Sequence, residues 1–218
     1  METIRDAILY GTLEPGQKLV ERELCAMLDV SRTLLREALR QLQAEGLITN
    51  VMHKGPSVAV ITKDVAQEIY EIRQLLEGQL TYNFALRATD EQIDELDKAV
   101  QQLWEPGMAD NAQLLLQTKN SFYDVLMAGS GNGTIAQLLV QLTNRVTLLR
   151  RKSLAAPGRV DAMRTELASI VEAVRARDPE AAAQRCREHV ARAGEIILAS
   201  FDSHAAGETA NDLEKTAV

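Results

Sequence analysis

Residues 21–48 read ERELCAMLDVSRTLLREALRQLQAEGLI. The first eight residues predict a short helix, and a tight connection of two residues follows it. Ser31 is a good N-cap for a second helix over residues 32–45, and Gly46 is suited to end that helix. Apolar side chains recur at helical spacing and predict the buried face of this second helix: Leu35, Ala38, Leu39 and Leu42.

The flanking segments complete a small mixed module. Residues 2–10 carry apolar side chains at helical spacing, and Gly11 ends that helix. After Gly46 the pattern becomes extended, with a short strand expected on each side of the polar tip at residues 53–56. Three short helices followed by a hairpin predict a winged helix-turn-helix domain over residues 1–62.

The chain from Asp64 onward is predicted to be helical almost to its end. Turn residues such as Pro106-Gly107 and Pro157-Gly158 separate the expected helices. These helices are placed near residues 64–88, 90–104, 110–129, 134–152, 159–177 and 179–201. The predicted fold class is therefore mostly α, with an all-helical bundle of about six helices over residues 63–203. Residues 204–218 lack an apolar stripe and are expected to form a mobile tail.

Composition limits the possible functions. The chain has 46% apolar and 25% charged residues, which suits a globular protein with a real core. No apolar run reaches the roughly 18 residues that span a membrane, and the first residues do not resemble a signal peptide. The two cysteines are far apart and form no metal-binding motif. We therefore expect a cytoplasmic protein that does not bind membranes.

Enzymatic activity is not expected. The sequence contains no Ser-His-Asp grouping, glycine-rich phosphate loop, CxxC motif or HExxH motif. It has three histidines, two of which fall in the expected hairpin tip and tail. Little is left for acid–base catalysis.

The second helix of the quoted stretch suits DNA binding. The net charge of −7 argues against nucleic acids as partners, but residues 31–43 carry three arginines and one glutamate, a local balance of 3 − 1 = +2. Arg32, Arg36 and Arg40 lie four apart and present guanidinium groups that grip phosphates or read guanine. Ser31 and Thr33, at the helix N-terminus, suit a phosphate oxygen. A solvated charged face is the alternative interpretation.

The stretch from Ile8 to Val60 is similar to the DNA-binding domain of the GntR family of regulators. The matching pieces are AILYGTLEPGQKL, the stretch quoted above, and KGPSV. One departure is Leu34, where the family usually has proline, and leucine is tolerated at the start of a helix. The resemblance implies DNA contacts by Arg22 and Arg32, by Ser31, Thr33 and Arg36 of the recognition helix, and by Lys54 and Gly55 at the wing tip.

The helical domain resembles the FCD type of effector domain. The matching pieces are IYEIRQLLEGQL, FYDVLMAGSGN and VEAVRARDPEAAAQRCREHV. Many members of that branch bind a divalent metal through one aspartate and three histidines. Here Lys119, Tyr123 and Leu167 align with three of those ligands, and only His189 is retained. One imidazole cannot hold such an ion, so no metal and no other cofactor is expected.

The same substitutions suggest a different sensing site. A metal supplies positive charge for a carboxylate ligand, and Lys119 brings an ammonium group close to that position. The expected effector site comprises Arg73, Lys119, Tyr123, Arg145, Arg150 and His189. Alternatively, Lys119 points outward or pairs with an acid such as Asp124 or Glu77, and His189 is an ordinary core residue.

The resemblance implies a homodimeric transcription regulator, expected to be a repressor, that binds an inverted repeat in double-stranded DNA. A small anionic metabolite bound in the bundle would alter its DNA affinity. The long helix from Asp64 joins the two domains and is the expected transmitter. Two alternatives stay open: a sensor of acyl-coenzyme A, because lipid-sensing members also lack the metal, and a regulator whose bundle only dimerises.

Overall fold

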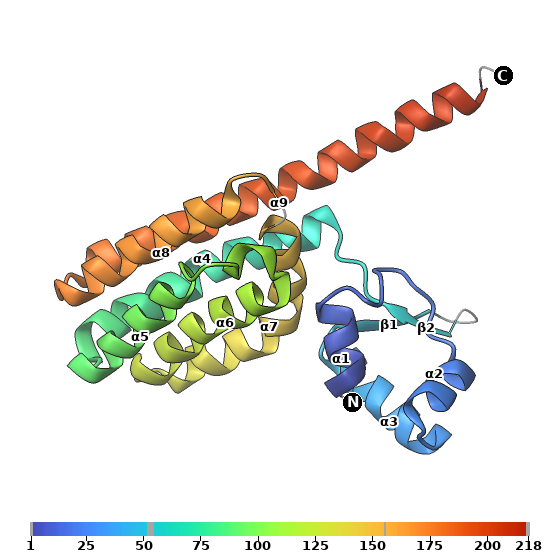
Figure 1. The fold of residues 1–218 in the computed structure, drawn as a ribbon, viewed down its shortest axis with the longest axis horizontal. Helices are drawn as coiled ribbons and strands as arrows, with labels where there is room; N and C mark the ends of the chain where they lie inside the picture. Colours follow the sequence, from blue (N-terminus) through green and yellow to red (C-terminus); the bar gives the residue numbers. More distant parts are fainter. Residues whose placement is uncertain (1, 52–54, 155, 217–218) are drawn as a thin grey trace. The chain divides into compact units, whose positions relative to one another are not determined.

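The computed structural model describes residues 2–51, 55–154 and 156–216. The chain divides into two compact units. Unit 1 comprises Met1–Ile61 with Val140–Arg151, and unit 2 comprises Thr62–Leu139 with Lys152–Val218. Figure 1 traces the chain through both units from blue to red.

Unit 1 contains the winged helix-turn-helix. Its elements are α1 (Glu2–Leu9), α2 (Glu21–Leu28), α3 (Arg32–Ala44), β1 (Ile48–Val51) and β2 (Gly55–Val58). The two strands are antiparallel, with Ile48 opposite Val58. The backbone N–H of Leu34 donates to Ser31 Oγ at 3.3 Å, so Ser31 is the N-cap of α3 as predicted. Apolar side chains from all these segments form one core, which includes Ile4, Ile8, Leu24, Leu35, Leu42, Leu47 and Val58.

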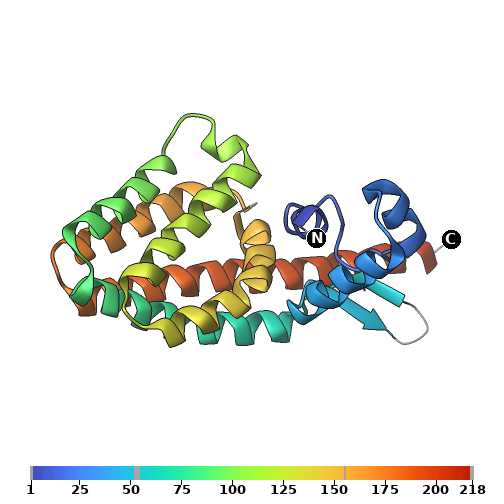
Figure 2. The same ribbon diagram turned by 90° about the horizontal axis from the view of Figure 1, so that it is seen from below.

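Unit 2 is a helical bundle. Its elements are α4 (Lys63–Arg87), α5 (Asp90–Gln102), the short 3-10 helix η1 (Met108–Asp110), α6 (Ala112–Gly129), α8 (Arg159–Arg175) and α9 (Pro179–Thr216). Helix α7 (Gly133–Leu154) has its residues 140–151 in unit 1 and its two ends in unit 2. Helix α4 packs along α9, and α5 packs on α6 and α8 (Figure 2).

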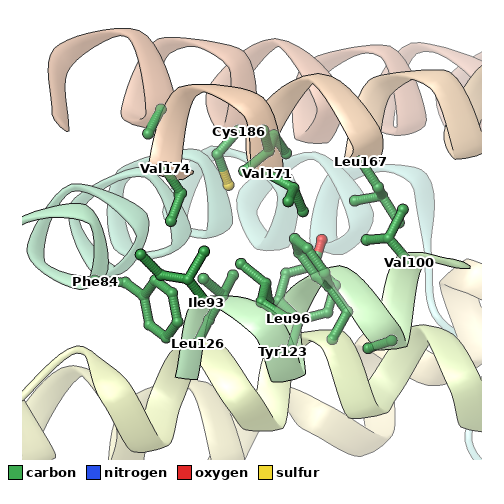
Figure 3. Packing of buried hydrophobic residues seen from close by; sticks show 14 of the residues in the cluster. Phe84, Ile93, Leu96, Val100, Tyr123, Leu126, Leu167, Val171, Val174 and Cys186 are labelled. Atoms are coloured by element: carbon green, nitrogen blue, oxygen red, sulfur yellow. The ribbon is translucent and has the colours of Figure 1, made fainter. Parts of the chain in front are cut away.

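The core of unit 2 is apolar where these helices meet. Figure 3 shows Phe84 of α4, Leu96 of α5, Tyr123 of α6, Val171 of α8 and Cys186 of α9 in one cluster. Burial of such side chains stabilises a bundle by about 1.5–3 kcal/mol each.

A glycine sets how closely α4 and α9 approach. A Cβ atom added at Gly194 of α9 would lie 3.0 Å from the ring Cγ of Tyr70, on α4. The absence of a side chain at Gly194 therefore lets the Tyr70 ring lie against α9. Tyr70 in turn stacks on a buried arginine, described below, so this contact helps to position that arginine.

The predicted fold class is confirmed: the described chain is mostly helical, with a two-stranded wing and six helices from α4 to α9. One helix is longer than predicted, since α9 continues past residue 201 to Thr216. The added segment contains alanine, glutamate, leucine and lysine, which favour helix without an apolar stripe. Within the described ranges, no helix is long and apolar enough to span a membrane.

Candidate DNA-binding face and effector site

Helix α3 separates its charged and apolar side chains cleanly. Leu35, Leu39 and Leu42 are buried in unit 1. The residues predicted to touch DNA from this helix, Ser31, Arg32, Thr33, Arg36 and Arg40, are all exposed. Arg22 of α2 is exposed as well. Cationic side chains on one solvent-facing surface of a helix are what binding in a major groove requires.

Arg36 has a partner that the sequence did not reveal. Its Nε atom donates to both carboxylate oxygens of Glu21, at 3.1 and 3.0 Å. The hydrogen bond to Glu21 raises the pKa of Arg36, and the carboxylate offsets its charge. Glu21 lies on α2, fifteen residues earlier, so only the packing of α2 on α3 brings the two together. Glu21 therefore orients a guanidinium that faces solvent.

A groove joins the recognition helix to the wing. It has a volume of about 300 Å³, and its lining includes Glu21, Arg36, Arg40 and Gln43 from the helices and Asn50 and Pro56 from the wing. Gly55 begins β2 with a φ of 79°, in the left-handed region that favours glycine. Lys54, the other predicted wing contact, lies outside the described residues.

The structure brings four of the six predicted effector residues into unit 2. Arg73 of α4, Lys119 and Tyr123 of α6, and His189 of α9 are all buried. Lys119 has only 2% of its surface exposed, so the alternative in which it points into solvent is wrong. The remaining two, Arg145 and Arg150, belong to the α7 segment of unit 1. Arg145 is exposed, and its guanidinium lies beside Gly46.

Arg73 forms a buried ion pair within α4. Its Nε donates to Glu77 Oε1 at 2.6 Å, and its Nη2 donates to Oε2 at 3.3 Å. Its guanidinium carbon lies 4.7 Å from the centre of the Tyr70 ring. Burial lowers the pKa of Arg73, but the Glu77 carboxylate and nearby tyrosines outweigh burial and raise it. Arg73 Nη1 is buried and has no hydrogen-bond partner among the described residues.

A second buried cluster joins α8 to α9. Arg159 donates to Glu166 twice, from Nη1 to Oε1 at 2.9 Å and from Nη2 to Oε2 at 2.8 Å. His189 Nδ1 lies 2.6 Å from the same Oε2. Burial raises the pKa of Glu166, but the hydrogen bonds with His189 and Arg159 outweigh burial and lower it to about 2. Burial and the nearby Lys119 lower the pKa of His189 to about 3. At neutral pH the carboxylate is therefore ionised and the imidazole is neutral.

Sequence reasoning missed Arg159 and Glu166. They lie seven residues apart on α8, a spacing that places both on one helical face. That spacing was the available signal, but charged residues at such intervals usually face solvent. Glu166 also directly precedes Leu167, the position aligned with a metal ligand, and Leu167 is fully buried in the apolar core.

The side chains around His189 do not suit a metal ion. Leu167 offers no donor atom, and Arg159 already binds both oxygens of Glu166. Lys119 acts on His189 as a nearby cation and would repel a divalent ion. In the part of the chain that the structure describes, no group of three or more histidine, cysteine, aspartate or glutamate side chains could hold a metal.

Comparisons with known proteins match both the N-terminal part of the chain and the helical part that follows it. The profile described as "Bacterial regulatory proteins, gntR family" matches residues 1–58, and the FCD domain profile matches residues 68–192. The uncharacterized HTH-type transcriptional regulator YdhC of Bacillus subtilis is 29% identical, over 85% of this chain and 84% of its own. The HTH-type transcriptional repressor GlaR of Escherichia coli is 26% identical, over 86% and 89%.

A solved structure shares the fold. It is a putative GntR transcriptional regulator from Rhodococcus sp. RHA1, with a TM-score of 0.80 and 25% sequence identity. The match covers 92% of this chain and 96% of that one. The similarity therefore extends over both units.

Proposed function

Since this chain belongs to the GntR family of DNA-binding transcription regulators and carries an FCD domain, we propose that it represses genes until a small organic anion binds inside unit 2. Repression is proposed because the relative GlaR is named a repressor. The exposed arginines of α3 would enter the major groove, with Arg32 and Arg36 at base edges and Arg40 at phosphates. Two chains would place two such helices on an inverted repeat.

The balance of buried charge is the observation that carries the effector proposal. In the described part of unit 2, the buried cations are Arg73, Lys119 and Arg159, and the buried carboxylates are Glu77 and Glu166. The difference is 3 − 2 = +1, because His189 is neutral. Cationic side chains gathered on helices that pack together would attract a small organic anion. The proposed site needs no metal, because these side chains already supply positive charge.

The same balance argues against an acyl-coenzyme A effector. An acyl-coenzyme A carries several phosphate charges, and the described interior offers an excess of one. A small anion is the better match to this interior.

Helix α4 would transmit the effect of the ligand to the DNA-binding unit. It begins at Lys63, shortly after β2 ends at Val58, and it carries the ion pair of Arg73 and Glu77. A ligand changes DNA affinity only by its differential affinity for the two states of the protein, typically 1–3 kcal/mol. A ligand contact with Arg73 would act directly on the helix that continues from the wing.

Melting of the full chain with a panel of anions tests the proposal. The panel comprises small carboxylates, sugar acids and acyl-coenzyme A thioesters, with Lys119→Ala as the matched variant. We expect at least one small anion to raise the melting temperature of the wild type, because binding only the native state stabilises it, and to have no such effect on Lys119→Ala. A panel without any effect on the wild type would favour the ligand-independent dimeriser instead.

A further inference from the structure

One leucine of the recognition helix α3 is not part of the core. Three of the four leucines of α3 are buried in unit 1, whereas Leu34 has 55% of its surface exposed. Leu34 lies in the first turn of the helix, directly after Thr33, and its backbone N–H donates to the N-cap Ser31. The fold therefore leaves an apolar side chain among the polar and cationic ones that face solvent on this helix.

Leu34 and two of the exposed arginines occupy opposite flanks of α3. Arg36 and Arg40 line the groove beside the wing. Leu34 instead borders a second hollow of about 320 Å³, whose lining includes the apolar residues Val30 and Ala38. The α3 residues that line one hollow do not line the other. The helix thus presents cations on the flank beside the wing and an apolar surface on the other flank.

Packing within unit 1 does not account for a leucine at position 34. The side chain borders the hollow without closing it, and more than half of its surface stays in water. The gain from an apolar side chain is proportional to the apolar area that is removed from water. Single apolar side chains are common on protein surfaces, but this one lies on the helix that the family similarity assigns to DNA binding. A group outside the chain that covers Leu34 would add the missing burial.

The major groove of DNA offers one apolar group. Each base pair presents hydrogen-bond donors and acceptors there, and thymine adds a methyl group. The N-terminal residues of a recognition helix are the ones that reach the base edges. The side chain of Leu34 carries no hydrogen-bonding group, so it cannot bind a phosphate or a polar base edge. The methyl group of thymine is therefore the part of the DNA that this side chain fits.

We propose that Leu34 packs against the methyl group of a thymine in each half-site and so selects that base pair. This role in specificity rests on the proposed entry of α3 into the major groove. The arginines on the wing side of α3 would supply contacts that weaken as salt increases. The contact of Leu34 is apolar, so the preference for thymine should stay the same at high and low salt.

Deoxyuridine tests the contact, because it differs from thymidine only by lacking the methyl group. A DNA fragment that the full chain selects from a random pool is remade with each thymine of both half-sites replaced in turn, and fluorescence anisotropy gives each Kd. We expect one replacement to weaken wild-type binding about fourfold per half-site, the effect of exposing one methyl-sized apolar group. Leu34→Ala should bind the thymine and deoxyuridine versions equally at that position.

Two matched variants separate the methyl contact from a general loss of binding. Arg36→Ala should bind every version more weakly and keep the fourfold difference, because Arg36 lies on the other flank of α3. Leu34→Met keeps an apolar side chain and should retain most of the difference. Thermal melting of Leu34→Ala should resemble that of the wild type, because the leucine is exposed.

The possible results distinguish this proposal from the proposed DNA binding on which it rests. A wild type that binds all deoxyuridine versions alike, or a selected half-site without thymine, would overturn the role of Leu34 and leave DNA binding by α3 standing. A difference of the same size in Leu34→Ala would assign the methyl contact to another residue and would overturn it as well. A pool from which no sequence is enriched would count against DNA recognition by α3 and against this proposal with it.

Methylated cytosine provides the reciprocal test. At the position that is sensitive to deoxyuridine, the thymine–adenine pair is replaced by cytosine–guanine, with or without a methyl group at C5 of the cytosine. We expect the wild type to bind the methylated fragment about fourfold more tightly than the unmethylated one, and Leu34→Ala to bind the two alike. Equal binding of both fragments by the wild type would show that Leu34 does not recognise a methyl group.

Discussion

In unit 1 the arginines of α3 are exposed to solvent, whereas in unit 2 Arg73 and Arg159 are buried against carboxylates. Arg32 and Arg40 can exchange solvent for phosphate, whereas Arg36 must also give up its pair with Glu21, and salt screens all these interactions. The buried arginines are fixed in bidentate pairs, and losing a partner leaves a charge inside the protein. The same residue type therefore serves contact with a macromolecule in one unit and an internal charge balance in the other.

Removing a buried carboxylate should have the largest effect. Glu77→Gln leaves the Arg73 guanidinium without its ion-pair partner, and we expect unit 2 to lose about 3–5 kcal/mol of stability. Urea unfolding followed by circular dichroism measures the loss. Glu71→Gln is the matched control, because Glu71 is exposed on the same helix and its loss should cost less than about 0.5 kcal/mol. Similar losses for both variants would mean that burial does not distinguish the two sites.

Removing an exposed arginine should instead leave stability unchanged and weaken DNA binding. For Arg36→Ala we expect a loss of about 1–3 kcal/mol of binding free energy with a relaxed sequence preference. Fluorescence anisotropy measures the binding free energy on a DNA fragment that the protein selects from a random pool. The same measurement on altered copies of that fragment gives the sequence preference. Arg175→Ala removes an exposed arginine of unit 2 and should bind DNA like the wild type. Unchanged affinity in Arg36→Ala would remove this residue from the predicted DNA contacts.

Glu21→Gln should change DNA affinity in the opposite direction and by less. The substitution frees Arg36 from its ion pair and removes a negative charge from the groove beside the wing. We expect binding to strengthen by up to about fivefold at low salt, with the gain fading as salt increases. Titrations at two salt concentrations test this. Weaker binding would show that Glu21 holds Arg36 in the orientation that DNA requires.

The two cysteine thiols should also differ in how readily a reagent modifies them. This difference should affect neither DNA binding nor effector binding. Burial raises the pKa of Cys186 to about 12, so it stays a protonated, inaccessible thiol at pH 8. Cys25, in unit 1, is partly exposed. Under native conditions we expect a colorimetric thiol reagent to modify one cysteine quickly and the second only after unfolding. Rapid modification of both would place Cys186 within reach of solvent.

The sequence predicted unit 1 in more detail than the interior of unit 2. The Ser31 cap, the apolar face of α3 and the wing all follow from local patterns, and each prediction agrees with the structure. The pair of Glu21 and Arg36 depends on how two helices pack, which no local pattern records. Glu166 was missed for a related reason, since its partners lie on α8 and α9 and its helix has an ordinary amphipathic pattern.

An anion bound inside unit 2 is expected to alter DNA binding by unit 1. The most direct test is the Kd of the full chain for its selected DNA, measured with and without a saturating amount of the small anion that most raises its melting temperature. We expect that anion to change the Kd of the wild type by about 5- to 150-fold and to leave that of Lys119→Met unchanged. A wild-type Kd that the anion leaves unchanged, although it raises the melting temperature, would contradict this coupling.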